Sequence, residues 1–201
     1  MFTGIVQGIA KVVSIIHKNN FSEYKILFSN HLLQNINLGS SVSLNGCCLT
    51  VTNVNHNYVS FNVIKETLSL TNLINLIPND LLNIERSVKL GDEIGGHIVT
   101  GHIMNKIAII DIERSNNVSK IVLELTNPLL KKYVFYKGFI CLDGISLTVS
   151  DLSNNSFSVN LIPETIKRTT LYNKNIGDFV NIEIDYFSQL IVDTTFRLNK
   201  K

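Results

Sequence analysis

Short runs of apolar residues, separated by polar turns, make up most of the chain. Runs such as KVVSII, YKILF, CLTVTNV and YVSFNVI alternate apolar with polar positions and are rich in β-branched residues, which is typical of half-buried strands. Turn signals such as HKNN, LGSS and SNNS recur at about the 8 to 12 residue spacing of an antiparallel sandwich or barrel. The pattern predicts an all-β fold, with short helical turns at ETLSLTNL, ETIKRTTL and NPLLKKYV.

The chain repeats itself with a period of 98 residues. LNGCCLTV begins at Leu44 and LDGISLTV at Leu142, and SFNVIKETLSLTNL from Ser60 matches SVNLIPETIKRTTL from Ser158 with the same offset. NIE recurs at that offset as well, and FTGIV from Phe2 matches VTGHI with a one-residue slip. A period close to the size of a small domain indicates a tandem duplication.

The duplication divides the chain into three parts. Residues 1–95 are expected to form a first barrel and residues 96–187 a second, joined through LGDEIGG, whose glycines and charged residues mark a connection. Residues 188–201 form a tail in which Leu190, Ile191, Thr194 and Leu198 have helical spacing. An apolar helix face outside both repeats predicts oligomerisation.

Composition narrows the class of protein. Hydrophobic residues make up 45% and charged residues 17% of the 201 residues, so the chain can bury a core. A net charge of +2 is too small for a dedicated nucleic-acid binder, and no apolar run is long enough to span a membrane. The start MFTGIVQGIAKVV lacks the positive flank before an apolar run that a signal peptide has. Three cysteines, two of them adjacent, fit neither a disulfide framework nor a metal motif. We expect a cytoplasmic protein with reduced thiols.

Alternation within the repeated blocks separates packing residues from functional ones. Cys48 and Thr50 share one face of their strand, and Ser146 and Thr148 share the equivalent face in the second copy. The apolar residues between them are expected in the two cores: Cys47, Leu49 and Val51, and Ile145, Leu147 and Val149. Small hydroxyl or thiol groups that recur on the opposite face indicate a surface that contacts a ligand.

The second repeated block extends this surface. Asn62 and Ile64 face away from the core, as do Asn160 and Ile162, and the pairs Glu66–Thr67 and Glu164–Thr165 follow at equivalent strand ends. Hydroxyls, an amide and a carboxylate suit a polyhydroxylated or heterocyclic ligand. Alternatively, the glutamate and threonine only cap the next helical turn. Recurrence of the pair beside the LTV block favours the ligand.

Two histidines in GGHIVTGHIM suggest a metal site, but their spacing argues against one. His97 and His102 are five apart, so in a strand they face opposite sides and cannot jointly bind one ion, and no Asp, Glu or Cys nearby completes a ligand set. No metal is expected. His102 follows Gly101 and is placed at a pocket edge, with a surface or packing role as the alternative. The dinucleotide, P-loop and hydrolase motifs are absent from the sequence.

Differences between the two copies indicate where chemistry has been added. Cys48 corresponds to Ser146, Asn45 to Asp143, Ser87 to Asp185 and Ile5 to His102. The second copy has therefore gained ionisable groups. A serine near carboxylates and a histidine can support general acid/base catalysis or an activated nucleophile.

The motifs MFTGIV, NGCCLTV, KET, DEIGGH, VTGHI, YKGF, DGISLTV, LIPET, RTTL and VNIEIDYF together resemble the riboflavin synthase family of the alpha-chain type, over nearly the whole chain. The resemblance implies two six-stranded antiparallel Greek-key barrels in tandem, with a C-terminal helix that assembles a homotrimer. It also implies that two molecules of 6,7-dimethyl-8-ribityllumazine exchange a four-carbon unit, giving riboflavin and 5-amino-6-ribitylaminouracil. No redox cofactor and no metal are implied.

The resemblance places the site residues by motif. It implies an active site between the N-terminal barrel of one subunit and the C-terminal barrel of its neighbour. Association with lumazine synthase is a further candidate that the sequence leaves open. The N-terminal pocket is expected to use Gly4, Ile5, Val6, Cys48, Leu49, Thr50, Asn62, Val63, Ile64, Lys65, Glu66 and Thr67. The C-terminal pocket is expected to use Gly101, His102, Ile103, Lys137, Ser146, Leu147, Thr148, Ile162, Pro163, Glu164, Thr165, Ile166 and Lys167.

Catalytic roles are expected for Ser146 and Asp185 in acid/base chemistry and support of a nucleophile. Cys48 and His102 are expected to assist, Asp143 is a further candidate carboxylate, and Phe2 is expected to close the N-terminal pocket. Two other classes of protein remain open. A lumazine- or flavin-binding protein without catalysis would be expected to lose one pocket, and a purely structural double barrel would not require the polar faces to recur.

Overall fold

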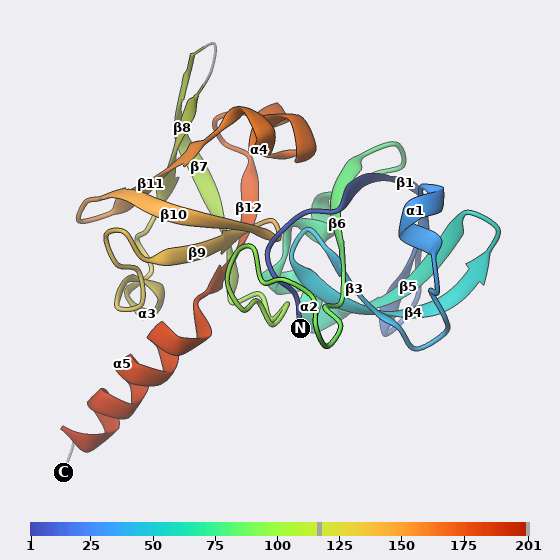
Figure 1. The fold of residues 1–201 in the computed structure, drawn as a ribbon, viewed down its shortest axis with the longest axis horizontal. Coiled ribbons are helices and arrows are strands. Elements are labelled where there is room, and N and C mark those ends of the chain that lie inside the picture. The colour runs from blue at the N-terminus through green and yellow to red at the C-terminus, as the bar shows by residue number, and fades with distance from the viewer. Residues whose placement is uncertain (116–117, 200–201) are drawn as a thin grey trace.

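The computed structural model describes residues 1–115 and 118–199, which form two barrels and a projecting helix (Figure 1). The first barrel contains β1 (Gly8–His17), β2 (Phe21–Leu27), α1 (Asn30–Leu33), β3 (Ser41–Leu44), β4 (Cys47–Asn55), β5 (Tyr58–Ile64), α2 (Lys65–Leu70), the 3-10 turn η1 (Asn72–Asn75) and β6 (Leu81–Arg86). The second contains β7 (Asn105–Arg114), β8 (Ser119–Glu124), α3 (Pro128–Lys131), β9 (Phe139–Leu142), β10 (Ile145–Leu152), β11 (Ser156–Leu161), α4 (Pro163–Arg168), η2 (Leu171–Asn173) and β12 (Phe179–Ile184).

Both barrels close with the same strand order. The first runs β1-β2-β5-β4-β3-β6, and the second runs β7-β8-β11-β10-β9-β12 around its circumference, with antiparallel pairing throughout. The jump from β2 to β5 is the Greek-key connection. Register shifts also recur at matching places, between Val51 and Asn53 in β4 and between Val149 and Asp151 in β10. The predicted all-β double Greek-key barrel and its duplication are confirmed.

Each barrel has its own apolar core. Val12, Tyr24, Phe61 and Leu82 are among the fully buried residues of the first, and a matching set fills the second. The three short helical segments expected from the sequence are present as α2, α4 and α3. Asn127 caps α3 because its side chain accepts a hydrogen bond from the Leu129 N–H at 2.9 Å.

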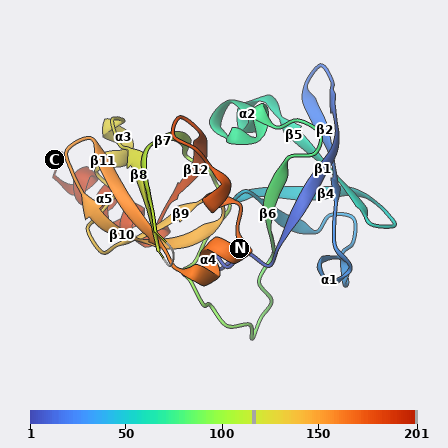
Figure 2. The ribbon, with the colours of Figure 1, turned by 90° about the horizontal axis from the view of Figure 1, so that it is seen from above.

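The two N-terminal segments of the repeats cross over between the barrels. Phe2 and Val99 form an antiparallel bridge, with N–H to carbonyl distances of 2.7 and 3.0 Å. Val6 then packs in the core of the second barrel, whereas Ile103 packs against the core of the first. The N-terminus accordingly lies at the junction of the barrels in both ribbon views (Figures 1 and 2).

Two hairpin turns meet back to back at this junction. Asn45–Gly46 joins β3 to β4 and Asp143–Gly144 joins β9 to β10, and all four residues have positive φ, as two-residue type I′ hairpins require. A Cβ atom added to Gly46 would lie 2.7 Å from the Gly144 nitrogen, and one added to Gly144 would lie 2.8 Å from the Gly46 nitrogen. The joint therefore depends on two glycines in backbone contact.

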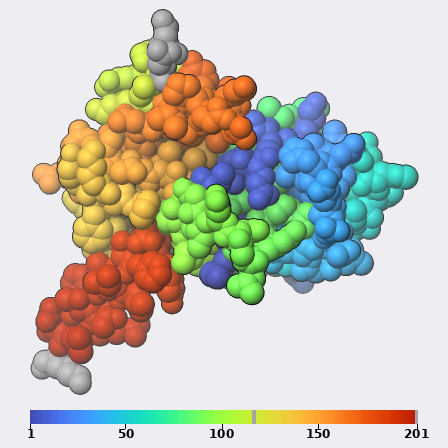
Figure 3. Space-filling view, viewed as in Figure 1, coloured from blue at the N-terminus to red at the C-terminus, as the bar shows by residue number. Residues whose placement is uncertain are grey.

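Helix α5 (Tyr186–Leu198) leaves the second barrel and projects away from it (Figures 1 and 3). It begins two residues before the expected tail, because the Asp185 side chain caps it by accepting the Ser188 N–H at 2.9 Å. Tyr133 and Lys132 donate to the Asp193 carboxylate at 2.6 and 2.9 Å and hold one side of the helix. No helix within the described ranges is long and apolar enough to cross a membrane.

Candidate active site

The polar faces predicted from alternation are present on both barrels. The side chains of Cys47, Leu49 and Val51 are buried, while Cys48 is half-buried and Thr50 is exposed. β10 repeats the pattern, with Ser146 half-buried and Thr148 exposed. Apolar side chains border both faces: Ile5, Ile64 and Ile162 are 47%, 53% and 58% exposed. Both faces are thus open surfaces with polar centres and uncovered apolar borders.

The structure corrects the grouping of the two pockets. The Ser146 N–H donates to the Gly4 carbonyl at 2.7 Å, and the Cys48 N–H donates to the Gly101 carbonyl at 2.9 Å. Because the N-terminal segments cross over, residues 4–6 border the face that carries Ser146, and residues 101–103 border the face that carries Cys48. The expectation that Gly4, Ile5 and Val6 belong with Cys48, and that Gly101, His102 and Ile103 belong with Ser146, is wrong.

Ser146 is hydrogen-bonded to a buried histidine. The Oγ atom of Ser146 lies 2.7 Å from Nδ1 of His97, whose imidazole is 6% exposed and stacks on Phe139 with ring centroids 5.0 Å apart. Phe139 pairs with Thr148 across β9 and β10, so the phenylalanine ring that stacks on His97 lies next to the polar face of β10. Gly96 permits the approach, since a Cβ atom there would lie 2.6 Å from the Ser146 Cβ and 2.2 Å from the Thr3 carbonyl oxygen. With the proton of the neutral imidazole on Nε2, the Ser146 hydroxyl donates to Nδ1, which is the arrangement that a base needs to activate a serine.

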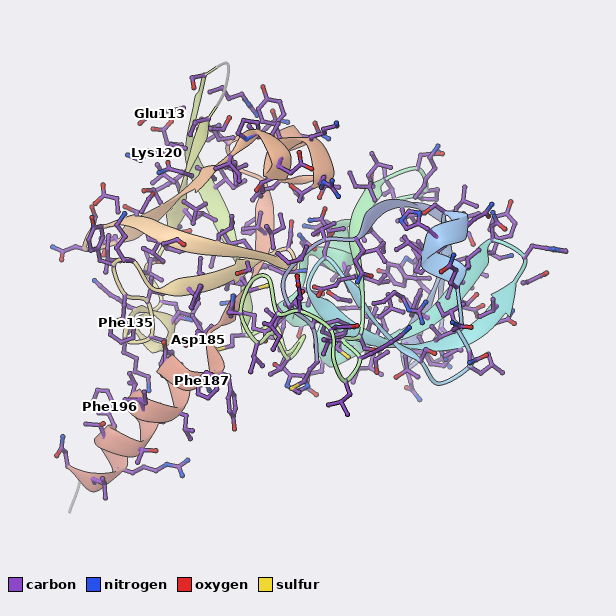
Figure 4. The ribbon with its side chains drawn as sticks, viewed as in Figure 1. Glu113, Lys120, Phe135, Asp185, Phe187 and Phe196 are labelled. Carbon is purple, nitrogen blue, oxygen red and sulfur yellow. The ribbon has the colours of Figure 1, made fainter. Side chains whose placement is uncertain are left out.

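Asp185 completes this group from the start of α5, at the point where the helix leaves the barrel (Figure 4). Its Oδ2 atom accepts from the Ser188 backbone N–H at 2.9 Å and from the Ser188 hydroxyl at 2.7 Å, which holds the buried carboxylate in place. Burial lowers the pKa of His97, and the negative charge of Asp185 opposes that shift. His97 is therefore a neutral base at neutral pH whose protonated form is stabilised by Asp185.

Three residues of this group, His97, Phe139 and Gly96, were not predicted as site residues from the sequence. Assignment of opposite faces to the two histidines assumed a strand, but residues 97–102 form a strand-like bridge only at Val99. The signal in the sequence was the pair of glycines before His97, because adjacent glycines allow the backbone to approach another residue closely and so indicate a contact at this point. The first copy lacks this arrangement: in the described part of the chain the Cys48 thiol makes no hydrogen bond to a histidine.

Other predicted residues lie at the borders or in the packing. His102 is exposed beside Gly101, next to Cys48. Lys137 has a φ of 62° and its N–H donates to the Val149 carbonyl, at the side of β10. Phe2 is only 1% exposed and packs with Val99 and Cys141 beneath Cys48, so it supports that face from below and does not close it. The side chains of Leu49, Val63 and Leu147 are buried in the cores, which leaves only their backbone groups for a ligand.

The helices that follow β5 and β11 carry the glutamate–threonine pairs. Both helices have an isoleucine at the N-cap and no side-chain cap hydrogen bond, so Glu66 and Glu164 do not form capping boxes. Glu66 is exposed, and Glu164 pairs with Arg168 one turn later. Lys65, Pro163 and Lys167 are exposed on the same helices, while Thr67, Thr165 and Ile166 are half-buried. Each face therefore has one exposed carboxylate at its border, Glu66 or Glu164, that a ligand can contact.

Asp143 lies apart from the Ser146 group, inside the joint between the barrels. Its side chain is fully buried and accepts from the Asn181 N–H and the Asn72 amide, both at 2.8 Å. Its second oxygen has no hydrogen-bond partner among the described residues, and the Lys174 ammonium is 3.9 Å away. Burial raises the pKa of this carboxyl to about 6, and Lys174 opposes the shift. This position indicates a packing role for Asp143 in the joint between the two barrels.

Replacing Asp143 by asparagine, the residue of the first copy, is expected to stabilise the protein above pH 6. The folded state takes up the Asp143 proton more readily than the unfolded state, so wild-type stability falls as pH rises from about 4 to about 6. A shift of two pKa units corresponds to about 3 kcal/mol, of which the loss of the Lys174 partner removes a part. Urea unfolding at pH 8 and pH 4 measures the difference. A variant less stable than wild type at pH 8 would contradict this assignment.

Two of the larger hollows of the described residues lie beside the polar faces and not on Ser146 or Cys48. One of about 500 Å³ is lined by Thr3, Ile5 and Glu85, next to the Ser146 face. A hollow of about 670 Å³ lies at the joint, lined by equivalent residues of the two copies such as Asn75 and Asn173, and Asp80 and Asp178. Ser146, His97 and Cys48 do not line it. Within residues 1–115 and 118–199, no group of three histidine, cysteine or acidic side chains is placed to hold a metal ion. Ligand binding is thus expected on the open faces.

Comparison with known proteins identifies the class of this double barrel. The lumazine binding domain family matches the chain twice, over residues 3–87 and 100–185. Crystal structures of LumP share the fold: the complex with 6,7-dimethyl-8-(1'-D-ribityl) lumazine has a TM-score of 0.82 at 23% identity, covering 91% of this chain and 98% of LumP. The complex with riboflavin has a TM-score of 0.85 at 23% identity, covering 92% and 99%.

Closer sequence relatives narrow the class to a family. Riboflavin synthase of Buchnera aphidicola subsp. Schizaphis graminum (strain Sg) is 52% identical over 201 residues, covering 100% of this chain and 97% of the relative. Riboflavin synthase of Escherichia coli (strain K12) is 50% identical over 198 residues, covering 98% and 93%. The chain belongs to the riboflavin synthase family.

Proposed function

We propose that the chain is a cytoplasmic transferase that converts two molecules of 6,7-dimethyl-8-ribityllumazine into riboflavin and 5-amino-6-ribitylaminouracil. One lumazine gives up a four-carbon unit and the other receives it, so the reaction consumes no external oxidant or cofactor. The observation that carries the proposal is the pairing of Ser146 with His97 on one of two otherwise equivalent binding faces. The three free cysteines support a reducing compartment.

Duplication of the binding face fits a reaction between two copies of one substrate. Backbone groups of β4 and β10 are proposed to bind the pyrimidine-dione edge of each lumazine, and Glu66, Thr67, Glu164 and Thr165 its ribityl hydroxyls. The exposed isoleucines at the borders offer apolar contacts to the ring methyl groups. Holding two substrates face to face makes the reaction effectively unimolecular, which is worth up to about 7–11 kcal/mol of the barrier.

Proton transfer is proposed to depend on the second face. One lumazine must lose a proton from its C7 methyl group, and the other must accept a nucleophile at C7. The neutral imidazole of His97 removes a proton from the Ser146 hydroxyl, or from substrate through it, and Asp185 stabilises the imidazolium that forms. Cys48 occupies the equivalent place without a histidine, so its face is proposed to bind and orient the partner molecule, with His102 at its edge.

Incubation of the purified protein with the lumazine alone tests the proposed reaction. Riboflavin and 5-amino-6-ribitylaminouracil should appear in equal amounts, each at half of the lumazine consumed, with no cofactor added. Chromatography with absorbance detection measures all three species. Binding of the lumazine without product would instead indicate the non-catalytic carrier, which is the alternative function.

A homotrimer that covers the open faces is proposed as the working assembly. Phe187, Leu190 and Ile191 on α5 are 54%, 51% and 66% exposed, and Phe187 is labelled in Figure 4. Phe196 lies on the other side of the helix, where the Lys132 ammonium is 5.1 Å from its ring centroid. The opposite side of the helix is fixed to the barrel through Asp193 and Val192. An apolar surface of this kind supports association with other copies of the chain. Association with lumazine synthase stays a prediction.

Charge on this helix face is expected to dissociate the assembly. The double substitution Leu190→Glu and Ile191→Glu places two carboxylates where apolar side chains would be buried, and should yield monomers with at least about a tenfold loss of kcat. Gln189→Glu, which adds a charge to the half-buried side of the same helix, serves as the control. Sedimentation velocity measures the mass. A wild-type chain that is monomeric at micromolar concentration, or a double variant that stays associated, would refute the proposed assembly.

A further inference from the structure

Two buried carboxylates occupy equivalent positions in the two barrels, and their hydrogen bonds within the described residues go to the crossing segments. Glu85 in β6 is 3% exposed, and its Oε1 atom accepts from the Thr3 N–H at 2.6 Å and the Thr3 hydroxyl at 2.8 Å, while Oε2 accepts from the Gly4 N–H at 3.1 Å. Glu183 in β12 is 4% exposed and makes the same three bonds to Thr100 and Gly101, at 2.6, 2.8 and 3.0 Å.

The segment that each carboxylate holds borders the binding face of the other barrel. Glu85 belongs to the first barrel, yet the carbonyl of Gly4 accepts from the N–H of Ser146 in the second. Glu183 belongs to the second barrel, yet the carbonyl of Gly101 accepts from the N–H of Cys48 in the first. The carbonyl of Thr3, which Glu85 also holds, accepts a hydrogen bond from the backbone N–H of His97 at 3.1 Å. Glu85 is therefore connected to both members of the serine–histidine pair.

We infer that Glu85 and Glu183 are positioning residues that act crosswise: Glu85 fixes the Ser146–His97 pair, and Glu183 fixes the backbone beside Cys48. Hydrogen bonds to a buried carboxylate are charge-assisted and strong. A glutamine has the same shape, but only one of its two terminal atoms accepts hydrogen bonds, so it must lose the bond to the glycine N–H or those to the threonine. The crossed connection predicts that the two equivalent substitutions damage different sites.

Glu85→Gln and Glu183→Gln form a matched pair with two readouts. The first is kcat for riboflavin formation, which rests on the proposed function. The second is the rate at which the half-buried Cys48 thiol reacts with 5,5'-dithiobis(2-nitrobenzoate), which does not rest on it; Cys47 and Cys141 are buried, and a Cys48→Ser background identifies the thiol. Glu183→Gln should speed Cys48 labelling about tenfold, while Glu85→Gln, which reaches Cys48 only through the packing of Phe2, should change labelling far less and lower kcat about tenfold or more.

Milder substitutions keep the test valid if a glutamine variant fails to fold. Thr3→Val removes one bond to Glu85, and Thr3→Ser restores it; Thr100→Val and Thr100→Ser do the same for Glu183. The same crossed pattern is expected, with rescue by each serine. Equal acceleration of labelling in both members of a pair, or unchanged labelling in the Glu183 and Thr100 variants, would overturn the inference. If the wild type forms no riboflavin, the proposed function fails while the labelling result still decides the crossed connection.

Discussion

Replacing His97 by glutamine is expected to lower kcat by about 10²- to 10⁴-fold, the usual contribution of a general base. Glutamine can still hydrogen-bond to the Ser146 hydroxyl, but it cannot take its proton. Affinity for the lumazine should change by less than about threefold, since the imidazole is buried behind the serine. Ser146→Ala should cause a loss of similar size, and the double variant should lose little more, because the two residues act as one unit. Steady-state kinetics on the three variants measures these effects.

His56→Asn is the matched control, because His56 is exposed in the turn between β4 and β5, away from the pair. Its kcat should equal that of the wild type. A His97→Gln variant whose kcat stays within twofold of wild type would contradict the role of the pair. It would then leave proximity and desolvation as the source of the acceleration.

The pH profile offers an independent check on the same base. Because burial lowers the pKa of His97, the wild-type rate should hold down to a pH below the ordinary histidine pKa of about 6.5 and then fall as the imidazole is protonated. His97→Gln should lose that acidic limb. An acidic limb that persists unchanged in the variant would assign the titration to another group.

Replacing Gly46 by alanine is expected to destabilise the protein by about 3–5 kcal/mol. The new Cβ would lie 2.7 Å from the Gly144 backbone nitrogen, so the two barrels must separate at their joint. The positive φ of 82° adds about 1–2 kcal/mol for any residue with a Cβ. Gly144→Ala meets the reciprocal contact at 2.8 Å and should behave alike. Midpoints of urea unfolding give the loss of stability.

Gly39→Ala separates the two contributions. Gly39 has nearly the same φ, 83°, but no atom lies within 4 Å of its added Cβ, so only the backbone cost of about 1–2 kcal/mol applies. The excess loss in Gly46→Ala therefore measures the contact between the barrels. Equal destabilisation by the two substitutions would show that the joint can open without cost.

The fold could be predicted from the sequence because its signals are local or periodic. Alternation in CLTVTNV and ISLTVSDL assigned Cys48 and Ser146 to the outward face correctly, and the 98-residue period revealed the two barrels. Crossing of the N-terminal segments could not be predicted in this way. It depends on the bridge between Phe2 and Val99 and on hydrogen bonds such as that from Ser146 to Gly4, which join residues far apart in the sequence.

The candidate site was only partly predictable for the same reason. Comparison of the copies singled out Ser146 and Asp185, but it could not include His97, which enters through the crossing segment and not through a strand. For Asp143, the change from Asn45 suggested chemistry. A second difference between the copies points to an ion pair in the joint instead. Lys174 stands where the first copy has Leu76, and its ammonium lies 3.9 Å from the Asp143 carboxylate.

Mixed assemblies of two inactive chains test most directly the central claim, that one reaction uses a Cys48 face and a Ser146 face of different chains. One chain carries Ser146→Ala; the other carries Thr50→Trp, which fills the exposed centre of the first face. Each alone should be inactive, whereas co-expressed chains should recover about a quarter of wild-type kcat if trimers assemble at random. Recovery should be absent when the separately assembled proteins are mixed without subunit exchange. No recovery on co-expression would contradict a site shared between subunits.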